Sequence, residues 1–213
     1  MMSLLTADYS HCALLLIDFQ NDFILPGSPA EIAGSYAILP KLQQLVQAVR
    51  SQGRPVIHVV RCYLPDGSNV DPCRRELIQS GAAIVPPGSH GADFPQQLKP
   101  AAAPPLDWEI LLKGDFQQIG PQEWVLYKSR WGAFYQTQLE AFLHQLQVNT
   151  LIFGGCNFPN CPRTSIYEAS ERDFRLVLAQ DAMSGLYERG LQELRGIGVT
   201  IALTDQICRE FLS

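Results

Sequence analysis

Short apolar runs alternate with amphipathic helical patterns along almost the whole chain, and this alternation limits the possible folds. The apolar runs cover residues 13–17, 55–60, 124–127, 150–153, 176–179 and 199–203, and are typical of strands that a sheet buries on both faces. Helical spacing occurs over residues 38–51 and 134–145, from about residue 162, and around Leu191. We therefore predict an α/β fold: a three-layer sandwich with a mostly parallel six-stranded sheet, right-handed crossovers and helices on both faces.

One segment interrupts this alternation. Residues 62–107 are rich in Pro and Gly and lack a long periodic stretch. A connection of this length is usually functional or disordered. Since 213 residues suffice for one α/β domain, we predict a single domain over residues 1–213 in which residues 62–107 cover the active site.

Charge and cysteine usage indicate the class of partner and the compartment. The net charge is -5, and basic residues occur in short pairs such as Arg74-Arg75, which argues against nucleic acid as a partner. The six cysteines include no CxxC pair, and the first eleven residues lack the pattern of a signal peptide. We expect a cytoplasmic protein that acts on a small molecule and not at a membrane.

Three chemically capable side chains follow three of the predicted strands. Asp18 comes directly after the first strand and Lys128 after the third, while Cys161 lies in a turn after the fourth. Taken singly, these residues are more often a helix cap, a surface charge and a small buried side chain. Because ligands bind at the carboxyl ends of parallel strands, the three together predict one catalytic crevice.

The local sequence around Cys161 favours a reactive thiol. Pro162 suits the first position of a helix, which would make Cys161 the N-cap at the positive end of the helix dipole. We therefore expect a lowered thiol pKa, lowered further by Lys128. Asp18 can accept the thiol proton and return it to a leaving amine, and backbone N–H groups of residues 155–161 can form an oxyanion hole.

Three motifs resemble those of the isochorismatase-like hydrolases, a superfamily of isochorismatases, nicotinamidases, N-carbamoylsarcosine amidohydrolases and ureido-compound amidases. Residues 15–23 (Leu-Leu-Ile-Asp-Phe-Gln-Asn-Asp-Phe) resemble its Asp-x-Gln signature, and residues 128–139 resemble its Lys segment followed by Phe-x-x-Thr-x-Leu. Gly155, Cys161 and the later pair Asp181-Ala182 resemble its nucleophile turn. The motifs occur in the family's order, and the resemblance extends over nearly the whole chain from about Ala13.

The resemblance implies a Cys–Asp–Lys triad, which Cys161, Asp18 and Lys128 would form. It also implies a non-proline cis peptide between Cys156 and Asn157, with the N–H groups of Asn157 and Cys161 as oxyanion donors. The implied reaction is hydrolysis of a small amide or ureido C–N bond through a thioester, in a homodimer or homotetramer. Cys156 is the rival nucleophile, and we reject it because it precedes the implied cis peptide and does not cap the helix.

The turn departs from the family pattern at Asn157, Phe158 and Pro159, where small residues are usual. We expect this departure to change which substrate binds more than which reaction is catalysed. A substrate carboxylate has three candidate partners, Arg61, Arg74 and Arg75. The candidate substrate contacts as a group are Gln20, Phe23, Arg61, Trp131, Phe134 and Phe158.

Nicotinamidases bind a metal through an Asp and two His after the second strand, but here His58 has no second His before His90. Metal-binding His residues usually form close sets, so we predict no metal and no cofactor, and we interpret His58 as a core residue. Two alternatives stay open: vinyl-ether hydrolysis of the isochorismatase type, and a non-catalytic binding protein that retains the fold.

Overall fold

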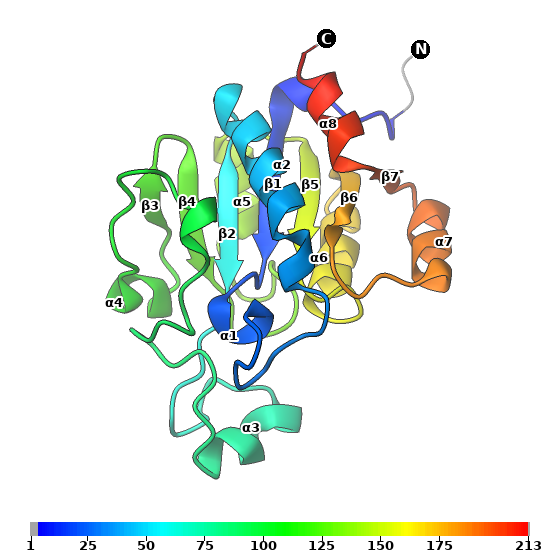
Figure 1. The fold of residues 1–213 in the computed structure, drawn as a ribbon. Coiled ribbons are helices and arrows are strands. Elements are labelled where there is room, and N and C mark those ends of the chain that lie inside the picture. The colour runs from blue at the N-terminus through cyan, green and yellow to red at the C-terminus, as the bar shows by residue number, and fades with distance from the viewer. Residues whose placement is uncertain (1–3, 213) are drawn as a thin grey trace.

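A single sheet of seven strands forms the centre of the molecule (Figure 1). The computed structural model describes residues 4–212. Along the sheet the order is β3-β4-β2-β1-β5-β6-β7, and every neighbouring pair is parallel except β3 and β4. The strands are β1 (Cys12–Ile17), β2 (Val56–Val60), β3 (Gln117–Gly120), β4 (Glu123–Tyr127), β5 (Thr150–Gly155), β6 (Arg175–Met183) and β7 (Thr200–Ala202).

All six predicted strands are present, but the predicted number of strands is wrong because β3 was missed. This edge strand pairs antiparallel with β4 through the register Gln118 to Trp124, and Gln122 turns the hairpin with a φ of 53°. Its sequence, Gln-Gln-Ile-Gly, contains one large apolar residue. A short polar edge strand carries almost no hydrophobic signal, so only its partner reveals it.

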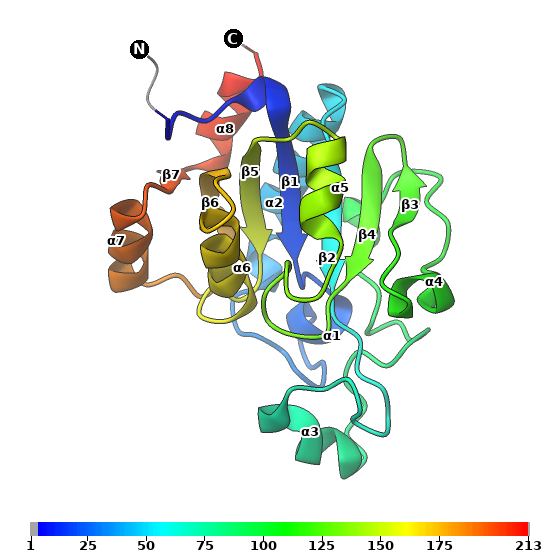
Figure 2. The ribbon, with the colours of Figure 1, turned by 180° about the vertical axis from the view of Figure 1, so that it is seen from behind.

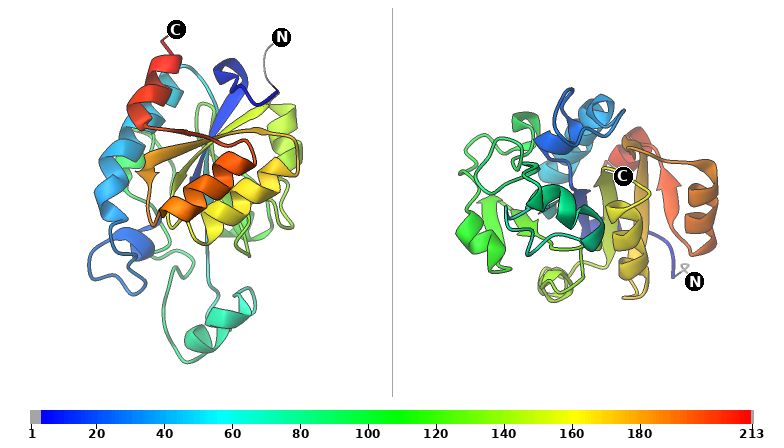
Figure 3. Two further views of the ribbon diagram at one scale, coloured as in Figure 1. Left: turned by 90° about the vertical axis from the view of Figure 1, so that its right-hand side faces the viewer. Right: turned by 90° about the horizontal axis from the view of Figure 1, so that it is seen from below.

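Helices cover both faces of the sheet (Figures 1 and 2). The largest on one face is α2 (Leu39–Ser51), which α8 (Thr204–Glu210) accompanies, while α5 (Leu139–Gln145), α6 (Cys161–Ser170) and α7 (Glu188–Gly196) pack on the other. Figure 3 shows the resulting layers from the side. The remaining helices are short and are α1 (Asn21–Ile24), α3 (Pro72–Gln79) and α4 (Trp108–Leu112), with 3-10 turns at Tyr9–His11, Tyr36–Ile38 and Gln96–Leu98.

The central strand β1 is apolar at every position because both of its faces are buried. Leu14 and Leu16 belong to the same apolar cluster as Leu42 of α2. Leu15 belongs to the cluster on the opposite face, together with Ile166 of α6. The continuous apolar run therefore reflects a strand that helps to form two cores.

The helix predicted over residues 134–145 begins later, at Leu139. Gln136 has a φ of 53°, a left-handed conformation that a right-handed helix cannot contain. The apolar residue Phe134 therefore belongs to an irregular connection after β4, and the predicted start of the helix is wrong, whereas the helix itself is present.

The segment 62–107 contains α3 and the turn Gln96–Leu98. Helix α3 lies beyond the carboxyl ends of the strands (Figures 1 and 3). Val85, Phe94 and Leu98 are buried and belong to the same apolar cluster as β1 and α2. The segment thus shares the apolar core with the sheet, while its helix α3 lies over the strand ends.

No helix within residues 4–212 is both long enough and apolar enough to cross a membrane.

The sheet has a switch in strand order at β1, because the chain continues to β2 on one side and reaches β5 on the other. At this point the ends of β1 and β5 touch. A Cβ on Gly155 would lie 2.2 Å from the carbonyl oxygen of Ile17, and Gly155 has a φ of 123°, so only glycine fits. This close approach brings the turn after β5 to the end of β1, where α/β folds of this type bind ligands.

Candidate active site

Asp18 directly follows β1 and is 4% exposed. Its N–H donates to the carbonyl oxygen of Val59 over 2.9 Å, which fixes it against β2, and its φ is 50°. Carboxylate oxygen Oδ2 accepts a hydrogen bond from Lys128 Nζ at 2.9 Å. The other oxygen, Oδ1, is buried and accepts no hydrogen bond from any residue in 4–212. Asp18 therefore has one oxygen held and one oxygen available.

Lys128 directly follows β4 and is completely buried. Its N–H donates to the carbonyl oxygen of Val60 over 3.0 Å, and Nζ donates to the carbonyl oxygen of Arg130 over 3.2 Å as well as to Asp18. A buried ammonium group needs such partners, because transfer of a charge from water into the protein interior costs on the order of several kcal/mol. These contacts hold Lys128 against Asp18, and Lys128 itself does not line the cavity described below.

Cys161 is the first residue of α6, and Asn160 is the N-cap. The predicted N-cap position of Cys161 is thus wrong by one residue, because Asn160 has the non-helical conformation and Pro162 takes the second helical position. Burial raises the pKa of Cys161 to about 11, with the Asp18 charge adding to the rise and Lys128 and Arg61 opposing it. The direction of this shift is opposite to the lowered pKa expected from the sequence, because burial outweighs the nearby positive charges.

The turn between β5 and α6 contains the implied cis peptide, between Cys156 and Asn157. The N–H groups of Asn157 and Cys161 donate to no other residue in the part of the chain that the structure describes. The Cys156 thiol donates to the backbone oxygen of Asp18 over 3.0 Å, and burial raises its pKa well above the ordinary value. Two backbone donors are therefore available in this turn, whereas the Cys156 thiol is engaged.

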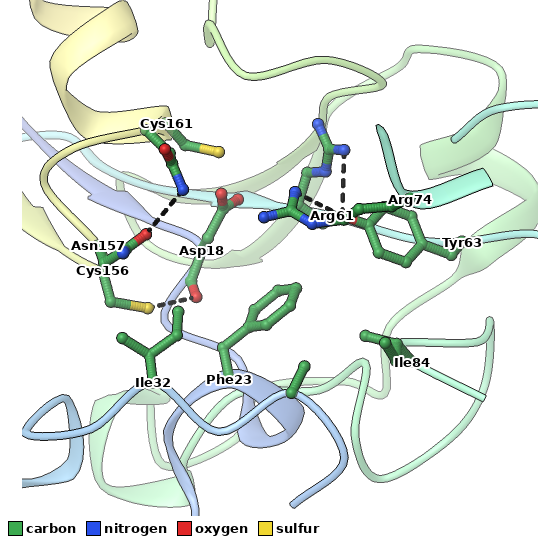
Figure 4. Close-up of a pocket in the computed structure, with 12 residues that line it drawn as sticks. Asp18, Phe23, Ile32, Arg61, Tyr63, Arg74, Ile84, Cys156, Asn157 and Cys161 are labelled. Atoms are coloured by element: carbon green, nitrogen blue, oxygen red, sulfur yellow. Dashed lines mark hydrogen bonds between the residues drawn. The ribbon is translucent and has the colours of Figure 1, made fainter. Parts of the chain in front are cut away.

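Asp18 and Cys161 line one small cavity of about 120 Å³. Figure 4 shows the Asp18 carboxylate pointing toward the Cys161 thiol. Apolar side chains line part of the cavity, and two arginines and a tyrosine line another part. The other lining residues are Phe23, Ala30, Ile32, Arg61, Tyr63, Arg74, Ile84, Cys156, Asn157 and Asn160.

Of the six candidate substrate contacts, Phe23 and Arg61 line this cavity and four residues do not. Both polar atoms of the Gln20 amide form hydrogen bonds with the backbone. Nε2 donates to the carbonyl oxygens of Arg61 and Ala92, and Oε1 accepts from the N–H of Arg61. Gln20 therefore positions the end of β2 and has no free group for a ligand.

The other three aromatic candidates lie elsewhere. Trp131 is 37% exposed and lines a separate surface depression with Tyr135. Phe134 and Phe158 are buried in the apolar cluster beneath α5, α6 and α7, where Phe158 contacts Tyr187 edge-on. Their aromatic character reflects core packing, which a single sequence cannot distinguish from a pocket wall.

Sequence reasoning missed several lining residues. Ile32 and Ile84 come from irregular segments, where no periodicity marks them. Tyr63 lies three positions after the end of β2, close to Arg61. Its nearness to the strand end could have identified it as a residue of the site. Arg74, one of three arginines left open, lines the cavity, whereas Arg75 does not.

His58 has structural contacts on both sides of its ring. Its Nε2 lies 2.6 Å from Glu123 Oε1, and the ring stacks on Phe94 with centroids 4.2 Å apart. Burial lowers the pKa of His58. Within residues 4–212, no three His, Cys, Asp or Glu side chains are grouped as a metal would require. The residues after β2 thus do not form the ligand set of a nicotinamidase-type site.

Replacing Lys128 by methionine is expected to slow alkylation of Cys161 by iodoacetamide at pH 8 by about 10-fold or more, since loss of a nearby positive charge raises a thiol pKa by roughly one unit or more. The measurement is the rate of Cys161 modification between pH 6 and 10, followed by mass spectrometry. Wild type should react faster as the pH rises toward its pKa of about 11. An unshifted profile in Lys128→Met would show that Lys128 does not act on the thiol.

The family model described as the isochorismatase domain matches residues 12–206. The "Probable inactive nicotinamidase" of Arabidopsis thaliana is 28% identical, with 90% of this chain and 91% of the relative covered. N-carbamoylsarcosine amidase of an Arthrobacter species is 25% identical, with 92% and 69% covered. A crystal structure of an isochorismatase family protein from Desulfovibrio vulgaris superposes with a TM-score of 0.81 at 30% identity, covering 95% of this chain and 99% of that one.

Proposed function

The chain belongs to the isochorismatase family, and on this premise we propose that it is a cysteine hydrolase cleaving a small amide or ureido C–N bond through a thioester. One observation carries the proposal. The free oxygen of Asp18, whose other oxygen Lys128 holds at 2.9 Å, and the Cys161 thiol line the same small cavity. A carboxylate base beside a thiol is the arrangement that covalent hydrolysis of a carbonyl compound requires.

In the first half of the reaction, Cys161 Sγ forms a bond to the substrate carbonyl carbon while its proton moves to Asp18 Oδ1. The carbonyl oxygen gains negative charge, which the N–H groups of Asn157 and Cys161 stabilise. The tetrahedral intermediate then collapses: the C–N bond breaks, and Asp18 returns the proton to the leaving nitrogen. Ammonia or an amine departs and the acyl group stays on Cys161 as a thioester.

In the second half, water attacks the thioester carbon and gives its proton to Asp18. The C–S bond breaks, the acid product leaves, and Cys161 recovers a proton from Asp18. Because the buried thiol has a raised pKa, proton transfer to Asp18 accompanies attack and a stable thiolate is not needed beforehand. Lys128 compensates the charge of Asp18 throughout and keeps its free oxygen directed to the cavity.

The two alternatives differ from this proposal at the nucleophile. Vinyl-ether hydrolysis does not need a thiol next to a base, whereas Cys161 and Asp18 line the cavity together. A binding protein needs no turnover at all, and the relative from Arabidopsis is named as inactive, so turnover must be measured directly.

The test is ammonia release from a panel of aliphatic amides, ω-amic acids, ureido acids and nicotinamide. We expect release from at least one amide or ureido class, with an acyl adduct on Cys161 when the reaction is quenched with acid and examined by mass spectrometry. Absence of ammonia across the panel, from protein shown to be folded by circular dichroism, would contradict the proposal.

A further inference from the structure

The cavity carries more positive than negative charge. The charged residues that line it are Arg61, Arg74 and Asp18. Lys128 and Asp71 form ion pairs with these residues, which gives three cations and two carboxylates in all. Lys128 pairs with Asp18, and Arg61 pairs with Asp71. Arg74 reaches Asp71 only at 3.9 Å. Among the residues that the structure describes, Arg74 therefore has no anionic partner closer than 3.9 Å, and it lines the same cavity as Cys161.

Arg61 contributes an unused donor to this wall. The residue is 1% exposed, and its Nη2 donates to Asp71 Oδ2 and, over 3.2 Å, to the Tyr63 hydroxyl. Its other terminal nitrogen, Nη1, is buried without a hydrogen-bond partner among residues 4–212. A buried guanidinium N–H group without an acceptor destabilises the protein. An unpaired N–H group in a cavity wall therefore indicates that a ligand supplies the acceptor.

Arg74 and Tyr63 complete a cluster of donors. Arg74 Nη1 donates to the Tyr63 hydroxyl over 3.3 Å, so this oxygen accepts from both arginines (Figure 4). Neither bond uses the phenolic hydrogen of Tyr63. The negative charge of a Cys161 thiolate would interact with both guanidinium groups, which places them within electrostatic reach of the nucleophile.

We propose that Arg61 and Arg74 bind a carboxylate of the substrate, with the Tyr63 hydroxyl as a further donor. Arg pairs bind carboxylates through charge-assisted hydrogen bonds, and a single carboxylate would neutralise the excess charge. This inference rests on the proposed function and narrows it: the substrate is a small monoanionic amide or ureido acid, with the scissile carbonyl at Cys161 and the carboxylate at the arginines. The apolar wall of Phe23, Ile32 and Ile84 contacts the short carbon chain between them. Neutral amides such as nicotinamide are poor substrates.

The test compares acids with esters that have the same scissile bond and no charge. Malonamate, succinamate, glutaramate and N-carbamoylglycine are each assayed for ammonia release beside their methyl esters. We expect at least one acid to have a kcat/KM roughly 10- to 100-fold above that of its ester, the range for a charge-assisted hydrogen bond. In Arg74→Gln this ratio is expected to fall by about 10-fold or more. Arg61→Lys retains the charge and removes the planar fork, and should lower the ratio as well.

Arg75→Gln is the matched control. It removes the same charge from the adjacent position of α3 but does not line the cavity, so the acid-to-ester ratio should stay at its wild-type value. Arg74 is half-exposed, so its replacement should leave the fold intact. Circular dichroism of each variant separates a lost contact from a lost fold.

Binding to Cys161→Ala, which cannot form the thioester, separates this inference from the proposed function. Calorimetry with the same acids and esters should show that the acid binds more tightly, and that Arg74→Gln in this background removes the difference. If acids and esters are hydrolysed equally well, the carboxylate site is overturned and the hydrolase stands. If nothing is hydrolysed but acids bind selectively, the carboxylate site stands and the hydrolase fails. Equal binding of acids and esters overturns the inference.

Discussion

Cys161→Ala is expected to lower kcat by at least about 10⁴-fold, since loss of a nucleophile removes the whole covalent pathway. Cys161 is the first residue of α6, and its buried thiol lines the cavity. Asp18, which has one carboxylate oxygen without a hydrogen bond, lines the same cavity. Alanine keeps the helix start and removes a single sulfur atom. The measurement is ammonia release from the best substrate of the panel, with burst-phase analysis to detect the acyl-enzyme.

Cys73→Ala is the control for this experiment. Cys73 is an exposed cysteine on α3 outside the cavity, so its removal should leave kcat unchanged. Fragmentation of the trapped acyl-enzyme should place the adduct on Cys161, although Cys156 lies only five residues earlier. Normal turnover by Cys161→Ala, or an adduct on Cys156, would show that the nucleophile has been assigned to the wrong residue.

Asp18→Asn is expected to reduce kcat by about 10²–10⁴-fold, the usual contribution of a general acid and base. Asparagine keeps the shape of the side chain but cannot accept the thiol proton. Burial, the largest cause of the raised Cys161 pKa, remains in this variant, and no base lies beside the thiol to take its proton. The activity that remains should increase with pH, as hydroxide takes over the role of the carboxylate.

The same variant also leaves Lys128 as a buried charge without its carboxylate partner. Removal of one partner of a buried ion pair typically costs about 3–5 kcal/mol, so Asp18→Asn should lower the melting temperature. The double variant Asp18→Asn/Lys128→Met removes both charges and should recover much of this stability without recovering activity. If the double variant regained turnover with stability, the role of Asp18 would be structural and not catalytic.

The order of the secondary structure could be predicted because hydrophobic periodicity is a local property. Residues 13–17 and 150–153 form strands whose side chains meet apolar neighbours on both faces, and such runs are visible without a partner. Strand β3 could not be predicted in this way, since its stability comes from the hydrogen bonds of β4 and not from its own side chains. The start of α5 was missed for a similar reason, as the left-handed Gln136 depends on the path of the whole connection.

The positions of Asp18, Lys128 and Cys161 followed from the sequence, because each residue follows a parallel strand directly or after a turn, and the ends of these strands meet at one edge. The chemistry of their surroundings did not. The raised pKa of Cys161 arises from burial, and the cluster of Arg61, Tyr63 and Arg74 arises where α3 lies over the strand ends. Burial and side-chain contacts across loops depend on segments that carry no periodic pattern, so only the tertiary structure decides what the cavity can bind.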